Sequence, residues 1–179
     1  MSEANLVERV RGGDREASRE FVRRYYPSVL RFLTTLCPNP SDAEELTQEA
    51  FIKALRGLRK FRGDSGLRTW LHRIAFHEYT HRRRAERSTL PIPESTTTPI
   101  FEANSLLALD LERALRCVPE ELRAAFVLCD LQELSMQEAA TVLSVPVGTV
   151  KSRLHTARKR LSDLLEPEPE VQIHVSQTR

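Results

Sequence analysis

The sequence VPVGTVKSRLHTARKR occupies residues 145–160, and a short apolar segment, Met136 to Leu143, precedes it. Two helices separated by so short a break form a helix-turn-helix, whose second helix normally enters a DNA major groove. From Val147 to Arg160 there are five Lys or Arg residues and no acidic residue. Apolar residues recur there at i, i+4, i+7 and i+11 and predict one buried stripe, formed by Val150, Leu154, Ala157 and Leu161. The remaining face is then free to meet phosphates and base edges. A solvated basic helix would share this charge, but the helix partner and the tight break favour DNA binding.

The composition excludes several classes of protein. A chain of 179 residues allows one or two domains, and no apolar run reaches the 18 residues of a membrane span. The first five residues are polar and resemble no signal peptide, so we expect a cytoplasmic protein without membrane insertion. Three scattered cysteines, Cys37, Cys117 and Cys129, predict buried, reduced thiols. We find no nucleophile–base constellation, phosphate loop or metal ligand set, which indicates a protein that is not an enzyme and needs no cofactor.

Helical periodicity extends through almost the whole chain and predicts an all-α fold. We expect helices over 4–11, 14–36, 42–58, 67–87, 106–117 and 119–131, followed by the helix-turn-helix. A capping box at Ser41–Glu44 should open the third helix, and Pro119 suits a first-turn position. Ser, Thr and Pro dominate residues 88–105, as is typical of a flexible linker. The predicted organisation is therefore a helical domain over 1–87, a linker over 88–105, a second helical domain over 106–166 and a disordered tail over 167–179.

The first domain carries an uneven distribution of charge. Residues 1–87 hold 18 basic and 12 acidic side chains. Acidic residues gather at the start of the third helix, where they also suit the helix dipole, so alone they equally indicate capping and a solvated face. Loop 61–66 contains two glycines, which alone usually indicate a turn. Trp70 shares a helix face with Arg73 and His77, and this pattern fits a core residue and a base-stacking platform about equally.

Three segments together resemble the small extracytoplasmic-function (ECF, group IV) sigma factors of bacterial RNA polymerase. Residues 42–51, DAEELTQEAF, look like the core-polymerase-binding helix of that family. The segments FRGDS at 61–65 and TWLHRIA at 69–75 look like its promoter-melting and −10-reading part. Residues 134–140 with 147–154 look like its −35-reading domain. The order and spacing of the three segments around a Pro/Ser/Thr linker make the resemblance specific.

The resemblance implies three groups of functional residues. The group expected to bind core polymerase, on a coiled coil of the largest subunit, is Asp42, Glu44, Glu45 and Gln48, with Phe51 or Leu55 as apolar anchors. The group expected to capture the melted −10 strand is Arg62, Asp64, Ser65, Arg68, Trp70, Arg73, His77, His81 and Arg84. The group expected to bind the −35 duplex is Thr149, Lys151, Ser152, Arg153, His155, Thr156, Arg158 and Lys159. Within this last group, Lys151, Ser152, His155 and Thr156 match base-reading positions, whereas the arginines and Lys159 fit phosphates or, in part, structural pairs with Asp130 and Asp163.

The chain departs from the family pattern at three of these positions. His77 and His81 stand where Asn, and Asp or Asn, are expected, and histidine does not make the bidentate amide contact to adenine. Thr156 stands where Arg is common. The −10 and −35 base preferences are therefore expected to differ from the usual ones.

The resemblance also implies partners: core RNA polymerase, including the flap of its second-largest subunit, promoter DNA and an anti-sigma factor. Two other classes remain open. A stand-alone helix-turn-helix regulator would explain residues 106–165 but not the acidic helix or the Trp70 face, and would usually bind a palindrome as a dimer. A sigma mimic that titrates a regulator would need no competent DNA surface.

Overall fold

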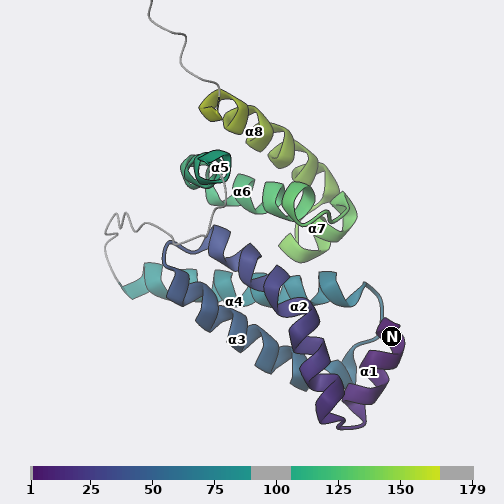
Figure 1. Ribbon diagram of the computed structural model, residues 1–179. Helices are drawn as coiled ribbons and strands as arrows, with labels where there is room; N and C mark the ends of the chain where they lie inside the picture. Colours follow the sequence, from purple (N-terminus) through teal and green to yellow (C-terminus); the bar gives the residue numbers. More distant parts are fainter. Residues whose placement is uncertain (1, 90–105, 166–179) are drawn as a thin grey trace, which may run out of the picture.

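The computed structural model describes residues 2–89 and 106–165, and every regular element in these two ranges is a helix (Figure 1). The predicted all-α fold with two helical domains is confirmed. The first four helices and one 3₁₀ turn form an N-terminal unit: α1 (Glu3–Arg11), α2 (Arg15–Leu36), α3 (Pro40–Gly57), η1 (Leu58–Lys60) and α4 (Leu67–Thr89). The others form a C-terminal unit: α5 (Leu106–Cys117), α6 (Glu120–Phe126), the π-helical turn η2 (Val127–Leu131), α7 (Met136–Leu143) and α8 (Val147–Leu165). The predicted linker and tail fall mostly on residues outside the described ranges.

The expected capping box at Ser41 is wrong. α3 begins two residues earlier than predicted, because the side chain of Asn39 accepts a hydrogen bond from the Ser41 backbone N–H and Pro40 takes the first helical position. Proline is favoured there because its missing N–H would have no partner in the helix. A complete capping box lies instead at the start of α7, between Ser135 and Glu138.

The predicted continuous helix over 119–131 is also wrong in detail. Pro119 is the N-cap of α6 rather than a residue of its first turn, and α6 ends at Phe126. Beyond it the backbone widens into η2, where the Gln132 N–H donates to the Val127 carbonyl at 2.8 Å. This five-residue spacing is that of a π-helix, which appears mostly as single turns and frequently at functional sites.

The core of the N-terminal unit lies where α2, α3 and α4 meet. Phe21, Val29 and Leu33 on α2 pack with Leu46 on α3 and Leu71 on α4, and each is at most 1% exposed. α1 covers one end of this bundle through Leu6 and Val7. Burial of a large apolar side chain contributes about 1.5–3 kcal/mol, so this cluster fixes the position of α4 and of the loop before it.

The helix-turn-helix is formed by α7 and α8. The predicted stripe of Val150, Leu154, Ala157 and Leu161 is buried, with exposures of 0 to 3%. Ser144 ends α7 in the left-handed conformation, at φ 54°, and directs the chain into the short turn. The stripe packs α8 against the rest of its unit and leaves the opposite face outward.

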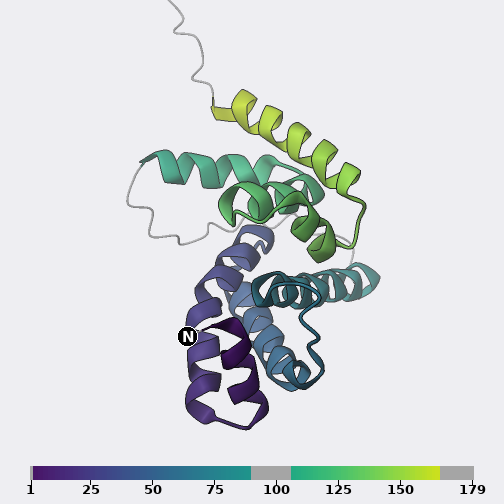
Figure 2. The same ribbon diagram turned by 90° about the vertical axis from the view of Figure 1, so that its right-hand side faces the viewer.

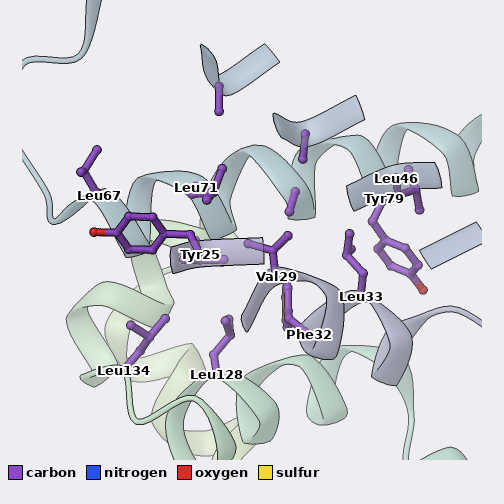
Figure 3. Close-up of a cluster of buried hydrophobic side chains, with 14 of the residues drawn as sticks. Tyr25, Val29, Phe32, Leu33, Leu46, Leu67, Leu71, Tyr79, Leu128 and Leu134 are labelled. Carbon is purple, nitrogen blue, oxygen red and sulfur yellow. The ribbon is translucent and has the colours of Figure 1, made fainter. Parts of the chain in front are cut away.

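The two units are packed against each other (Figure 2). α7 lies on α4, and α6 and η2 contact α2. Figure 3 shows Leu128 and Leu134 of the C-terminal unit beside the buried side chains of α2, and all of them belong to one apolar cluster. The molecule is therefore closed, with a shared core between its halves.

The expectation of three buried thiols is wrong for one of them. Cys37 is buried and Cys129 is half-buried, but Cys117 at the end of α5 is exposed. All three are free thiols. Burial raises the pKa of the Cys37 thiol to about 12, so it is protonated at neutral pH.

Candidate polymerase and promoter interfaces

The acidic surface predicted to bind polymerase lies on α3. Glu44, Glu45 and Gln48 are exposed, and Asp42 is half-buried at the start of the helix. Arg82 of α4 donates to Glu45 at 2.8 Å and to Glu49 at 3.2 Å, so part of this negative charge is already paired. A partner would therefore meet a carboxylate–guanidinium network rather than isolated acids.

The predicted apolar anchor Phe51 is not at the surface. It is 4% exposed, and its ring packs edge-on against Phe21 with centroids 5.7 Å apart, because it points into the core between α2 and α3. Leu55 is half-buried. Ile52 is 51% exposed and follows Glu45 and Gln48 on one helix face, at i+7 and i+4 respectively. Helical spacing predicts that Ile52 shares the exposed face of Glu45 and Gln48, so the sequence contained the signal for this apolar residue.

Loop 61–66 borders a cavity of about 350 Å³. One wall is the loop itself, and the other is α1. No sequence motif predicted that α1 lies beside this loop. The loop turns at Gly63, whose φ of 80° favours glycine. The lining includes Arg62, Gly63 and Ser65 from the loop and Glu3, Val7 and Arg11 from α1, whereas Asp64 lies outside it.

Arg11 ties this loop to α1. Its Nε donates to the Leu58 carbonyl at 3.1 Å, and its Nη2 donates to the Phe61 carbonyl. Both acceptors lie about fifty residues away in sequence, which is why no local pattern predicts them. One guanidinium thus binds two backbone carbonyls, one in η1 and one at the first residue of the loop, and restrains the conformation of this segment.

The −10 candidates on α4 divide between two faces. Arg73, His77, His81 and Arg84 are exposed along one side, and the rings of His77 and His81 stack with centroids 6.5 Å apart. Trp70 is half-buried at the head of this row. Arg68 lies on the other face, where its Nη2 donates to the Gln132 side chain of the C-terminal unit at 2.9 Å.

The half-buried position of Trp70 is set by its neighbours. Its ring contacts Phe61 with centroids 5.0 Å apart. A Cβ at position 57 would lie 3.3 Å from the indole, so Gly57 leaves room for it. The side chain is therefore held by packing but remains partly exposed, which is compatible with a stacking platform.

Behind this face two titratable groups are buried. Burial opposes ionisation of Glu78, but hydrogen bonds from Lys53 and His77 outweigh it and hold the pKa of Glu78 below its usual value. His72 is fully buried against Phe32, and burial lowers the pKa of its imidazole to about 4. His72 is therefore neutral at physiological pH.

The outward face of α8 carries the −35 candidates. Lys151, Ser152, His155, Thr156 and Lys159 are all exposed, and Thr149 is half-buried. The hydroxyl of Thr156 donates to the Ser152 carbonyl at 3.0 Å.

Two of the predicted phosphate-binding arginines have partners in their own unit. Arg158 makes a bidentate pair with Asp130, at 2.8 and 2.6 Å, which was one of the two structural pairs considered from the sequence. Arg153 pairs with Glu121 of α6. These pairs anchor α8 to η2 and α6, whereas Lys151 and Lys159 are exposed on the same helix.

Comparison with known proteins agrees with both halves of the structure. Residues 21–89 match sigma-70 region 2, and residues 108–161 match sigma-70 region 4. The RNA polymerase sigma-H factor of Pseudomonas aeruginosa is 34% identical over 180 residues, covering 90% of this chain and 93% of that protein. The ECF RNA polymerase sigma-E factor of Escherichia coli K12 is 34% identical over 187 residues, covering 93% and 96%.

A solved structure shares the fold of both units. The sigma factor RpoE of Bartonella quintana, crystallised in complex with the anti-sigma factor NepR, matches with a TM-score of 0.74 and 27% identity, over 84% of this chain and 98% of that one. The chain belongs to the ECF sigma factors, the initiation factors that direct RNA polymerase in transcription. As that family implies, its role is regulatory rather than catalytic. Within residues 2–89 and 106–165, no helix is long and apolar enough to cross a bilayer.

Proposed function

We propose that this chain gives RNA polymerase its promoter specificity through three of its own surfaces, each of which binds a different partner. The exposed face of α3 binds core polymerase, loop 61–66 with the outer face of α4 captures the melted −10 strand, and α8 reads the −35 duplex. The single observation that carries the proposal is the form of α8, whose buried stripe lies opposite an exposed face containing Lys151, Ser152 and His155. A helix of this kind, preceded by α7 across a short turn, fits a major groove.

The −10 surface fits a single strand better than a duplex. A base taken out of the stack needs a shaped pocket and aromatic or basic groups, because unstacking costs a few kcal/mol. The cavity beside loop 61–66, the half-exposed indole of Trp70 and the cationic side chains of Arg62 and Arg73 supply these elements. His77 and His81 replace amide side chains, so we expect stacking and single hydrogen bonds rather than bidentate adenine contacts at these positions.

The polymerase surface combines charge with one apolar contact. Glu44, Glu45 and Gln48 would pair with basic groups of the largest-subunit coiled coil, and Ile52 replaces Phe51 as the anchor. At the end of α8, Leu164 and Leu165 are 49% and 42% exposed, which suits an apolar contact with the flap of the second-largest subunit. The structural relative bound to NepR supports an anti-sigma factor as a further partner.

Run-off transcription with purified core polymerase and a randomised promoter library tests the proposal. The chain should select templates that share two elements, one near −10 and one near −35. Lys151→Ala should relax the selected sequence at one or two −35 base pairs only, whereas Thr141→Ala, an exposed α7 change away from α8, should leave the selection unchanged. Absence of any selected template, or a selection that Lys151→Ala does not alter, would refute the α8 assignment.

A further inference from the structure

The sequence HEYTH occupies residues 77–81, in the middle of α4. The pattern His-Glu-x-x-His on a helix brings two histidines to one face and is typical of zinc sites. Both histidines are exposed here, and their rings are nearly parallel, with centroids 6.5 Å apart and an angle of 20° between the planes. Two imidazoles thus meet solvent on adjacent turns of one helix.

The backbone between the two histidines is fixed by the core. Glu78 is 7% and Tyr79 2% exposed, and the Tyr79 hydroxyl donates to the Leu36 carbonyl of α2 at 3.4 Å. His77 and His81 are therefore carried by a well-packed helix, and only their side-chain torsions are free to change. A site built on such a helix holds its ligands more precisely than a site built on a loop.

Glu78 selects the nitrogen that His77 presents to solvent. Its Oε1 atom lies 3.4 Å from Nδ1 of His77, and Lys53 of α3 binds its Oε2 atom. Because an ionised carboxylate only accepts hydrogen bonds, Nδ1 carries the proton and the lone pair of the neutral imidazole is on Nε2. A metal-bound histidine nearly always donates its other ring N–H in this way. The structure thus contains the supporting carboxylate as well as the two ligands.

The same contacts remove Glu78 from the catalytic role that this motif has in other proteins. In zinc metalloproteases the glutamate is the general base. Here the side chain is buried and both of its oxygens have partners. In the part of the chain that the structure describes, no third His, Cys, Asp or Glu completes a metal cluster. The pair therefore offers two ligands to an ion, leaves its other positions open and supplies no base to activate water.

The two rings fit one ion after a small movement. With zinc–nitrogen bonds of about 2.0–2.1 Å, two imidazoles on a tetrahedral ion have centroids roughly 5 Å apart. The rings must therefore approach each other by about 1.5 Å. The His77 side chain is 74% exposed, so its torsions can change without disturbing the core.

The ligands and their neighbours restrict the kind of ion. Imidazole suits zinc, nickel and copper, whereas magnesium and calcium prefer oxygen ligands. Arg73 and Arg84 are exposed on the same face and oppose any dication, and the carboxylate of Glu78 partly offsets them. The site should therefore distinguish transition metals from alkaline-earth ions.

We propose that His77 and His81 form a site for a divalent transition metal ion, zinc in the first place, whose open positions are directed at the −10 strand. The metal site stands without the proposed promoter function, whereas the contact with the strand rests on it. Both imidazoles belong to the predicted −10 group, so a bound ion lies where we expect the strand. Phosphate oxygens or base nitrogens of the strand then complete the coordination of the ion.

Competition with a chromophoric zinc chelator measures the zinc affinity of the full chain, prepared without an affinity tag. His81→Gln should weaken this binding at least tenfold, since even the supporting partners of metal ligands contribute that much. His155→Gln is the matched control, because His155 is an exposed histidine on α8, and it should leave the zinc affinity unchanged. Excess magnesium should not displace the ion. Equal zinc affinities in His81→Gln and the wild type would overturn the site.

Heteronuclear NMR of the histidine rings identifies the ligands directly. Zinc should shift the Nε2 signals of His77 and His81, while Nδ1 of His77 stays protonated. The signals of buried His72 are the internal control and should not move. Shifts confined to other histidines would overturn the assignment.

Zinc affinity with and without single-stranded −10 DNA, of the sequence that run-off selection identifies, tests the contact with the strand. The strand should tighten zinc binding to the wild type by roughly fivefold or more, and zinc should tighten strand binding by the same factor. His81→Gln should show no such coupling. Unchanged or weaker zinc binding in the presence of the strand would overturn the contact. If the chain selects no promoter while zinc still binds through His81, the proposed function fails and the metal site stands.

Discussion

The buried imidazole of His72 makes a defined prediction about stability and pH. Its pKa in the folded chain is about 4, because burial disfavours the cation, whereas an exposed histidine titrates near 6.5. Between these values the unfolded chain binds a proton that the folded chain does not. Stability is therefore complete above about pH 6.5 and is lost as the pH falls towards 4.

The size of the effect follows from the two pKa values. Full protonation would cost about 3 kcal/mol, since each tenfold change in proton affinity is worth about 1.4 kcal/mol. Between pH 7 and pH 5 the expected loss is about 2 kcal/mol, because the unfolded imidazole is mostly charged at pH 5 and the buried one is mostly neutral. This is a large part of the stability of an ordinary domain.

Urea unfolding of wild type and His72→Leu at pH 7 and pH 5 measures this contribution. From pH 7 to pH 5, the free energy of unfolding should fall by about 2 kcal/mol less in the variant than in the wild type, whatever the stability of the variant at pH 7. The pKa values of Glu78 and Glu138 lie below the usual range, so these carboxylates lose their contribution to stability mainly at lower pH. Because both chains contain them, their effect cancels when the two chains are compared. Equal losses in the two chains, or an NMR titration of His72 near pH 6.5, would refute the reasoning.

Three further predictions concern the proposed surfaces. Glu44→Lys and Ile52→Asp should each weaken capture of core polymerase at least tenfold while the far-ultraviolet circular dichroism stays unchanged, because both side chains are exposed; normal capture by both would remove α3 from the interface. Trp70→Ala should block opening of duplex promoters yet recover transcription on a pre-melted template, and normal permanganate reactivity at −10 would assign Trp70 to the core alone. Arg11→Met should lower discrimination at the flipped −10 base without altering −35 binding, since η1 and the loop each lose one backbone restraint; unchanged −10 selection would contradict this.

Local pattern predicted most of the fold. The apolar stripe of α8 and the ends of α7 follow from helical periodicity, which depends only on nearby residues. The errors occurred where two local signals competed. Asn39 and Pro40 outcompeted Ser41 for the start of α3, and η2 broke a helix whose periodicity looked continuous.

The candidate surfaces were predicted only in part, for a different reason. Resemblance placed functional groups on α3, α4 and α8, but it did not separate exposed from buried members of a helix, as Phe51 and Ile52 demonstrate. Contacts between segments that are distant in the sequence produce no local sequence pattern, so they could not be predicted. The bonds from Arg11 to the loop and from Arg68 to Gln132 join residues about 50 and 64 positions apart, and only the folded chain brings them together.

The π-helical turn η2 restricts insertions and deletions in this part of the chain. η2 and the residue after it direct side chains to three places: Leu128 lies in the shared apolar cluster, Asp130 binds Arg158 of α8, and Gln132, the C-cap, binds Arg68. Removal of one residue would restore an α-helical pitch and rotate everything downstream by about 100° relative to α6. No single substitution could then repair all three contacts. Relatives that close in the same way should therefore align across 127–132 without gaps, even where their helices differ in sequence.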